Sequence, residues 1–198
     1  MNYTIDPTTQ ANLPPGYPYE WIGSVTLRDG TLVTIRPIRP DDAPRLQEGF
    51  TRLSARTIYL RFLQATSQLS DEQAKRFANL DYQTQMALVG SIQEQGEEQL
   101  IGVARYALVG SGDQEAAECA VVVRDDYQQR GLGTHLLVKL VQYARQQGIL
   151  AFIATVLASN SPVMNFIWKS GLHYDRKMVE PGVFQIRILL EDIDDTHT

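Results

Sequence analysis

One acidic residue stands inside a run of small and β-branched residues, at Glu118 in Ala117-Glu118-Cys119-Ala120-Val121. A carboxylate in such a run costs free energy unless it meets a partner or opens to a cleft. A carboxylate whose pKa is raised to roughly 6–7 can take a proton from a reacting group near neutral pH. Glu118 is therefore the candidate general base, and the alternative is a glutamate on the solvated face of a strand.

A glycine-punctuated loop follows this run and has the features of an anion site. Gly131 and Gly133 come just before leucines 136, 137 and 140, which repeat at helical spacing. Glycines let backbone N–H groups approach a ligand closely, and a helix N-terminus carries unpaired N–H groups and roughly half a positive charge. Together these properties suit a pyrophosphate. An ordinary strand–helix turn is the alternative.

Other site chemistries find less support. The loop lacks the longer glycine spacing of a dinucleotide fold and the lysine of a P-loop. Strand alternation points Cys119 away from Glu118, and no histidine lies in the motif to activate the thiol, so a covalent acyl-enzyme is not expected. His135 and His173 show no metal-ligand spacing, so no metal is expected.

The remaining sequence predicts the elements that must hold these residues. Asp29-Gly30 marks a tight hairpin, Ser70 and Gln73 form a capping-box pattern, and Ser161 reads as the cap of a short helix. Strands and helices together predict a mixed sheet with helices on its faces. The expected strands are 24–27, 31–38, 86–93, 100–109, 116–124, 150–157, 174–178 and 184–190, and the expected helices start at Asp41 or Asp42, Ser54, Ser70, near Gly133 and at Ser161.

Composition limits the class of protein. The 198 residues suit one domain at 21–191, preceded by an irregular arm at 1–20 and followed by an acidic tail at 192–198. A net charge of −5 argues against nucleic acid as the partner. A lone cysteine and no basic, apolar leader predict a cytoplasmic protein, and the longest apolar stretch is too short to span a membrane. The tyrosines of the arm can pin it to the domain or to a second copy in a homodimer.

The loop and its flanking elements resemble the acyl-CoA loop of the GNAT superfamily of N-acetyltransferases. That pattern is Gln or Arg, two residues, Gly, one residue, then Gly or Ala, and 128–133 match it. The resemblance runs from about Val25 to Leu190 and implies an α/β GNAT fold with a mixed, mostly antiparallel, splayed sheet flanked by helices. It also implies acetyl-CoA as cosubstrate. The cofactor-binding residues it implies are Val121, Val122, Val123, Gln128, Gln129, Arg130, Gly131, Leu132, Gly133, Thr134 and Asn160; for Asn160 a helix-entry turn is the alternative.

Residues 35–42, 81–89 and 118–126 resemble one branch of the superfamily, the Pat-type protein lysine acetyltransferases. In that branch the glutamate at the position of Glu118 serves as the base. The resemblance to this branch also implies a protein lysine as the acceptor. Many superfamily members place a general-acid tyrosine in the last short helix, and Trp168 is expected at that place here. Regulatory domains are frequent in Pat-type relatives, but none is expected within this chain. A small-amine acetyltransferase and a non-catalytic acyl-CoA sensor remain alternatives.

Overall fold

The computed structural model describes residues 13–64, 66–110 and 116–190. The strands are β1 (Gly23–Thr26), β2 (Leu32–Pro37), β3 (Gln85–Glu94), β4 (Glu97–Leu108), β5 (Ala116–Val123), β6 (Ala151–Leu157), β7 (Tyr174–Glu180) and β8 (Val183–Leu189). The α-helices are α2 (Ala43–Thr51), α3 (Ala55–Phe62), α4 (Asp71–Ala78), α5 (Leu132–Gln146) and α6 (Ser161–Lys169). Three 3-10 turns are η1 (Tyr19–Trp21), η2 (Pro40–Asp42) and η3 (Asp125–Tyr127).

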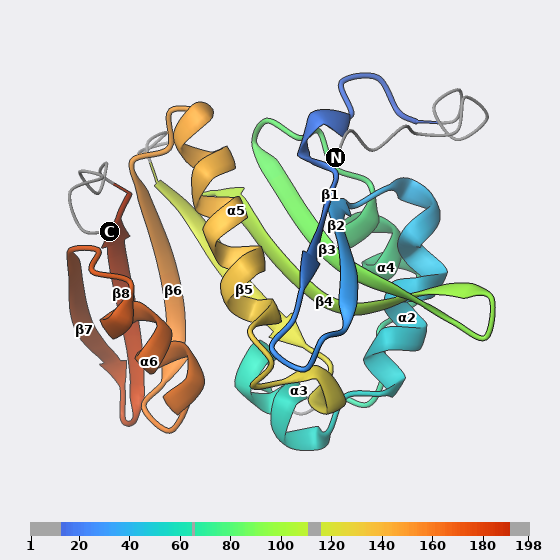
Figure 1. Ribbon diagram of the computed structural model, residues 1–198. Helices are drawn as coiled ribbons and strands as arrows, with labels where there is room; N and C mark the ends of the chain where they lie inside the picture. The colour runs from blue at the N-terminus through green and yellow to red at the C-terminus, as the bar shows by residue number, and fades with distance from the viewer. Residues whose placement is uncertain (1–12, 65, 111–115, 191–198) are drawn as a thin grey trace.

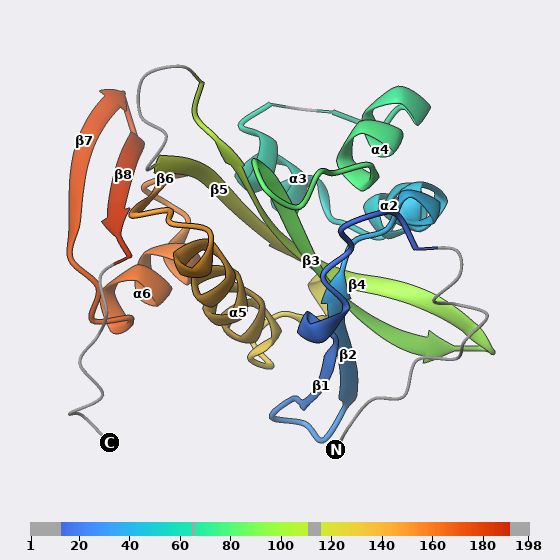
Figure 2. The ribbon, with the colours of Figure 1, turned by 90° about the horizontal axis from the view of Figure 1, so that it is seen from above.

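The strands form one sheet in the order β1-β2-β3-β4-β5-β6-β8-β7 (Figure 1). Neighbours pair antiparallel except β5 and β6, which are parallel because α5 carries the chain back between them. Helices α2, α3 and α4 cover one face, whereas α5 and α6 cover the other (Figure 2). This arrangement confirms the expected GNAT fold with a mixed sheet.

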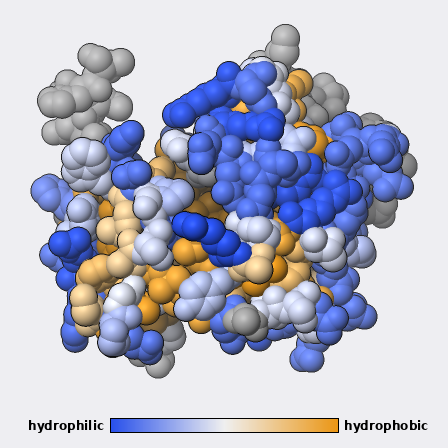
Figure 3. Space-filling view, turned by 90° about the horizontal axis from the view of Figure 1, so that it is seen from below, coloured by the Kyte–Doolittle hydropathy of each residue, from blue (hydrophilic) through white to orange (hydrophobic). Residues whose placement is uncertain are grey.

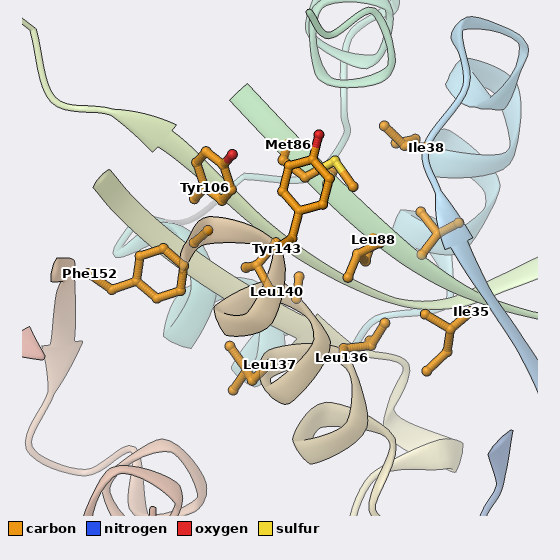
Figure 4. Packing of buried hydrophobic residues seen from close by; sticks show 14 of the residues in the cluster. Ile35, Ile38, Met86, Leu88, Tyr106, Leu136, Leu137, Leu140, Tyr143 and Phe152 are labelled. Carbon is orange, nitrogen blue, oxygen red and sulfur yellow. The ribbon is translucent and has the colours of Figure 1, made fainter. Parts of the chain in front are cut away.

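The main core lies between the sheet and α5 (Figure 4). Leu136 and Leu140 are fully buried there, and the Tyr143 hydroxyl donates to the Tyr82 carbonyl at 2.5 Å. Two glycines that are partners across β3 and β4, Gly90 and Gly102, lie under the first turn of the helix. An added Cβ would come within 2.9 Å of Leu132 at position 90 and within 3.0 Å at position 102. The glycine pair therefore lets the N-terminal end of α5 pack directly on the sheet.

A buried charge cluster ties β2 to the start of α2. The Arg36 guanidinium donates to both carboxylate oxygens of Asp42 at 2.7 Å and to Glu98 at 2.9 Å. Asp42 precedes α2 as predicted, but its side chain makes no cap hydrogen bond to that helix, because it is committed to Arg36 and to the Arg39 N–H. Losing one member of such a buried pair typically costs about 3–5 kcal/mol.

Of two other predicted helix caps, the structure confirms one and corrects the other. The Ser70–Gln73 capping box is present, which confirms that prediction. The cap of α6 is Asn160 instead of Ser161, because the Asn160 side chain accepts a hydrogen bond from the Val163 N–H.

Within the arm, Tyr17 is buried and donates to the Pro37 carbonyl at 2.8 Å, so this part of the arm packs on the domain. Residues 1–12 and the tail at 191–198 lie outside the described residues.

The charge cluster predicts an acid-dependent loss of stability. Burial alone would raise the pKa of Glu98, but hydrogen bonds and charge from Arg36 outweigh it and lower that pKa to about 2. A depressed carboxyl pKa stabilises the folded state above the unfolded pKa and loses that effect as pH falls through the folded value. Glu98→Gln should therefore lower the free energy of unfolding by at most about 3 kcal/mol at pH 7, with the difference shrinking from about pH 4.5 towards pH 2.

Urea unfolding at pH 7, 4 and 2.5 measures this difference, with the exposed neighbour Glu97→Gln as control. A deficit that stays the same at all three pH values would contradict the role given to the Glu98 charge.

Candidate active site

The central feature of the site is a break between β5 and β6. These strands pair only at Ala116 with Ala151, Ala117 with Phe152, and Glu118 with Ile153. Beyond this point they diverge, as the lower half of Figure 1 shows. By contrast, β6 pairs with β8 along its full length. The sheet is therefore splayed in its middle, as expected from the sequence.

A cavity of about 280 Å³ occupies the splay and is largely apolar. Its walls come from β5, β6, α3, α5 and α6, and Figure 3, which views the molecule from below, shows hydrophobic residues gathered in the middle of that face. Residues from both diverging strands line it, including Val121 and Thr155. An apolar slot of this kind, bounded by strand edges, suits an extended chain with few charges.

Glu118 lies at the apex of the splay. It is the last residue of β5 paired with β6, its side chain is exposed, and it lines the cavity. Five residues of strand separate it from Val123, which corresponds to about 17 Å. The carboxylate therefore stands at the closed end of the slot, whereas the glycine loop stands at the other end of β5.

The backbone of β5 alternates between its two neighbours. The N–H of Arg124, just after the strand, donates to Ile101 of β4, so the N–H and C=O groups of Val123 and Val121 face the opposite side, towards the splay. The Val123 carbonyl already accepts the Gln128 side-chain amide at 3.0 Å. Val122 faces β4 with its backbone and lines a smaller cavity on the other face with its side chain. Of the three valines, Val121 has both its backbone and its side chain at the splay.

The loop after β5 presents a series of unpaired amides. Within the described ranges, the N–H groups of 129–134 donate to no backbone or side-chain oxygen, and the first helical bond starts from the His135 N–H. Gln129 and Gly131 adopt positive φ angles of 61° and 99°, which turn successive N–H groups in the same direction. The N-terminus of α5 follows directly. The arrangement therefore offers an anion-binding nest, the feature that the sequence predicts.

Two side chains of this loop fix it to the start of α3. Asp125 accepts from the Ser54 N–H at 2.8 Å and from the Thr57 hydroxyl at 2.8 Å. Partial burial would raise the pKa of Asp125, but these hydrogen bonds outweigh it and hold the pKa below its usual value. The Gln128 amide donates to Thr57 as well as to Val123. Gln128 therefore acts within the protein as a brace between the loop and α3.

Charges around the loop come from the β1–β2 hairpin as well as from the loop itself. Arg130 pairs with Asp29 of the hairpin and stacks on Tyr127, with its Cζ 4.8 Å from the ring centroid. Arg28 is exposed, and its guanidinium lies 3.9 Å from where a Cβ on Gly131 would be. No pattern in the sequence indicates a role for Arg28, because it precedes the loop by about a hundred residues and only the fold brings the two together.

The remaining candidates near the cavity have different environments. Burial raises the pKa of the Cys119 thiol to about 12, so this residue stays protonated and a poor nucleophile. Trp168 is 72% exposed and does not line the cavity, whereas its neighbour Ile167 does. The expectation for Trp168 is thus corrected, because one residue along a helix turns the side chain by about 100°. The position on α6 that faces the cavity holds an aliphatic residue.

One further predicted residue, Asn160, lies beside the cavity, whereas Tyr143 lies away from it. Asn160 is 8% exposed, lines the cavity and caps α6 through the Val163 N–H at 3.5 Å, so its helix-entry role is confirmed and its cofactor contact stays a prediction. Tyr143 is buried in the core and lines neither cavity.

Several known proteins are similar to this chain in sequence and in fold. Residues 53–172 match the Acetyltransferase (GNAT) family. Acetyltransferase PA5475 of Pseudomonas aeruginosa is 36% identical over 140 residues, covering 71% of this chain and 73% of that protein. Acetyltransferase Pat of Mycolicibacterium smegmatis is 28% identical over 170 residues, covering 86% of this chain but 49% of Pat, so the chain spans about half of that relative. The crystal structure of the GNAT domain of S. lividans PAT matches with a TM-score of 0.78 and 31% identity, covering 87% of this chain and 99% of that domain.

The chain therefore belongs to the Acetyltransferase (GNAT) family. It is an N-acetyltransferase with acetyl-CoA as the acetyl donor, and its similarity to Pat-type domains confirms the resemblance seen in the sequence. Family membership and named relatives favour an enzyme over the non-catalytic sensor. No helix in the described part of the chain is long and apolar enough to cross a membrane.

The loop geometry predicts unequal effects of two glycine substitutions. Gly131→Ala places a side chain at a φ of 99°, which costs about 1–2 kcal/mol, so the Kd for coenzyme A should rise about tenfold if the nest deforms. Gly133→Ala is the matched control, because its Cβ meets only Val123 at an ordinary 3.6 Å. Isothermal titration calorimetry with coenzyme A measures both constants. Equal Kd values for the two variants would argue against the nest.

Proposed function

We propose that this acetyltransferase acts on a lysine side chain of a protein, with Glu118 as the general base. The observation that carries the proposal is the place of Glu118, an exposed carboxylate at the apex of the splay and on the wall of its cavity. A base there meets an amine that approaches the closed end of the slot. Similarity to the Pat-type domains supports a protein acceptor.

In this proposal each part of β5 and its loop has a separate task. The unpaired amides of 129–134 hold the pyrophosphate of acetyl-CoA, and Arg28 and Arg130 add positive charge beside it. The backbone groups of Val121 hydrogen-bond the pantetheine arm as a neighbouring strand would, and the free N–H of Val123 extends that edge. Gln128 supports the loop from within, and Asn160 fixes the start of α6 beside the slot.

The chemical step then needs one proton acceptor and one hydrogen-bond donor. Glu118 takes the proton from the lysine ammonium, and the neutral amine attacks the thioester carbonyl. A backbone N–H of β5 stabilises the negative charge on the carbonyl oxygen. The C–S bond breaks, the nitrogen releases its second proton as the amide forms, and the departing thiolate takes up a proton to leave as the thiol of coenzyme A. A thiol with a pKa of about 8.5 is an adequate leaving group without a tyrosine acid, which is consistent with the aliphatic Ile167 on the facing side of α6.

Glu118→Gln tests the base directly. It keeps the size of the side chain but removes the proton acceptor, so kcat for acetylation of a lysine peptide should fall by roughly 10²–10⁴. The Kd for coenzyme A should stay within about twofold, because the loop that binds its phosphates lies about 17 Å away. Stopped assays with labelled acetyl-CoA measure the rate, and calorimetry measures the binding.

Glu97→Gln is the control, because Glu97 is exposed and lines neither cavity. Full activity of Glu118→Gln would refute the base assignment. Wild-type turnover on small amines together with none on lysine peptides would refute the protein acceptor. Cytoplasmic localisation and a homodimer stay predictions from the sequence.

A further inference from the structure

Two arginines lie over the Phe77 ring on the face covered by α2, α3 and α4, and a third, Arg61, lies over Phe62 on the wall of the same cavity as Arg105. Arg105 of β4 lies with its Cζ 4.4 Å from the Phe77 ring centroid, and Arg76 of α4 lies 5.5 Å from the same centroid. Arg61 of α3 belongs to the group because its charge acts on Arg105. We call Arg61, Arg76 and Arg105 the arginine cluster.

The charge of Glu118 acts on Arg61, but among the described residues no acid lies at contact distance from Arg76 or Arg105. Among the residues with described structure, none of the three arginines forms an ion pair or donates a hydrogen bond. Burial, together with the neighbouring charges of Arg61 and Arg76, lowers the pKa of Arg105 to about 10. Arg36 shows the usual alternative, since two carboxylates surround it. Arg105 is thus a partly buried guanidinium without an anion at contact distance, which is ready to bind one.

The sheet register places the arginine cluster beside the candidate base. Arg105 is directly opposite Ala120, and Ala107 is directly opposite Glu118. Residues two apart on a strand share a face, so Arg105 and Glu118 point to the same face of the sheet, at a diagonal spacing of about 7–8 Å. Arg61 lines both the splay cavity and the second, smaller cavity. One positive and one negative site therefore lie within the length of a side chain of each other.

The second cavity gives the anion a place. It measures about 80 Å³, its lining is mostly apolar, and Arg61, Arg105 and Phe77 contribute to its wall. It shares Arg61, Phe62 and Ala120 with the cavity in the splay. This space suits one short side chain that ends in a carboxylate.

We infer that the arginine cluster selects acceptors that carry a carboxylate close to the reacting amine, namely protein lysines with a glutamate or aspartate beside them. The inference rests on the proposed function, because Glu118 must receive the amine for the arginine cluster to receive the carboxylate. The amine of such an acceptor lies opposite the Glu118 carboxylate, and its carboxylate lies opposite the arginine cluster. The two pairs of charges are opposite in sign and similar in spacing. Two other sources have the same chemistry: the α-carboxylate of a free amino acid and a carboxylate on the acyl group of the donor.

The test compares two peptides, a lysine flanked by glutamates and the same peptide with glutamines. Wild type should acetylate the glutamate peptide with a kcat/KM at least about tenfold higher, mainly through KM, since hydrogen bonds between charged groups are the stronger kind. Arg105→Gln should reduce this preference to about twofold or less, whereas Arg105→Lys should retain part of it. Arg56→Gln is the control, because Arg56 is exposed on α3 and lines neither cavity.

A second readout separates this inference from the proposed function. Calorimetry measures binding of the glutamate peptide to the protein loaded with coenzyme A, where no turnover occurs. Binding that depends on Arg105 without any turnover would support the arginine cluster and refute the protein-lysine reaction. Turnover without a preference for the glutamate peptide, or a preference that Arg105→Gln retains, would overturn the arginine cluster.

Two further arms identify the source of the carboxylate. Free lysine and ornithine are tested as acceptors. If wild type acetylates them with a higher kcat/KM than the glutamate peptide, and Arg105→Gln abolishes that difference, the carboxylate belongs to a free amino acid and the flanking-residue assignment is overturned. Succinyl-CoA as donor, used better than acetyl-CoA by wild type but not by Arg105→Gln, would assign the arginine cluster to the acyl group and overturn the inference. Melting temperatures of the Arg105 variants within a few degrees of wild type confirm that the fold is intact.

Discussion

The active site depends on the loss of hydrogen bonding between β5 and β6 after three residue pairs. Backbone N–H and C=O groups in a sheet need partners, and a strand edge within a molecule binds another extended chain readily. Because β6 turns away to pair with β8, the edge of β5 beyond Glu118 remains open. The same divergence creates the cavity and places Glu118 at its closed end.

Rigid neighbours keep this open edge from closing. Gly90 and Gly102 allow α5 to pack directly on β3 and β4, which fixes the position of the helix N-terminus and of the loop before it. Asp125 and Gln128 hold the loop to α3 from the other side. The unpaired amides of 129–134 are thus held outward by contacts that the loop itself does not supply, which is preorganisation for an anionic ligand.

Local patterns predicted much of this structure because the interactions that form it are local. The Ser70–Gln73 capping box, the glycine loop and the turn at Asp29-Gly30 each depend on residues a few positions apart. The sheet order and the splay followed from the resemblance to a known family rather than from periodicity.

Contacts between segments far apart in the sequence could not be predicted from such local patterns. Asp42 was expected to cap a helix, but Arg36 and Glu98 turn it into part of a buried ion-pair cluster. The arginine cluster unites α3, α4 and β4, and no spacing in the sequence indicates that it forms. Trp168 was misplaced by one residue, since helical phase at a short helix is set by its packing on β6 and β8 and by its cap at Asn160.

Amide hydrogen exchange by NMR tests the central claim most directly. Without coenzyme A, the Val121 N–H and the amides of 129–134 should exchange quickly, whereas the Val122 N–H, bonded to β4, should exchange slowly. Coenzyme A should slow exchange at Val121 and at 129–134 and leave Val122 unchanged. Slow exchange at Val121 before coenzyme A is added, or protection confined to other segments when it binds, would contradict the account.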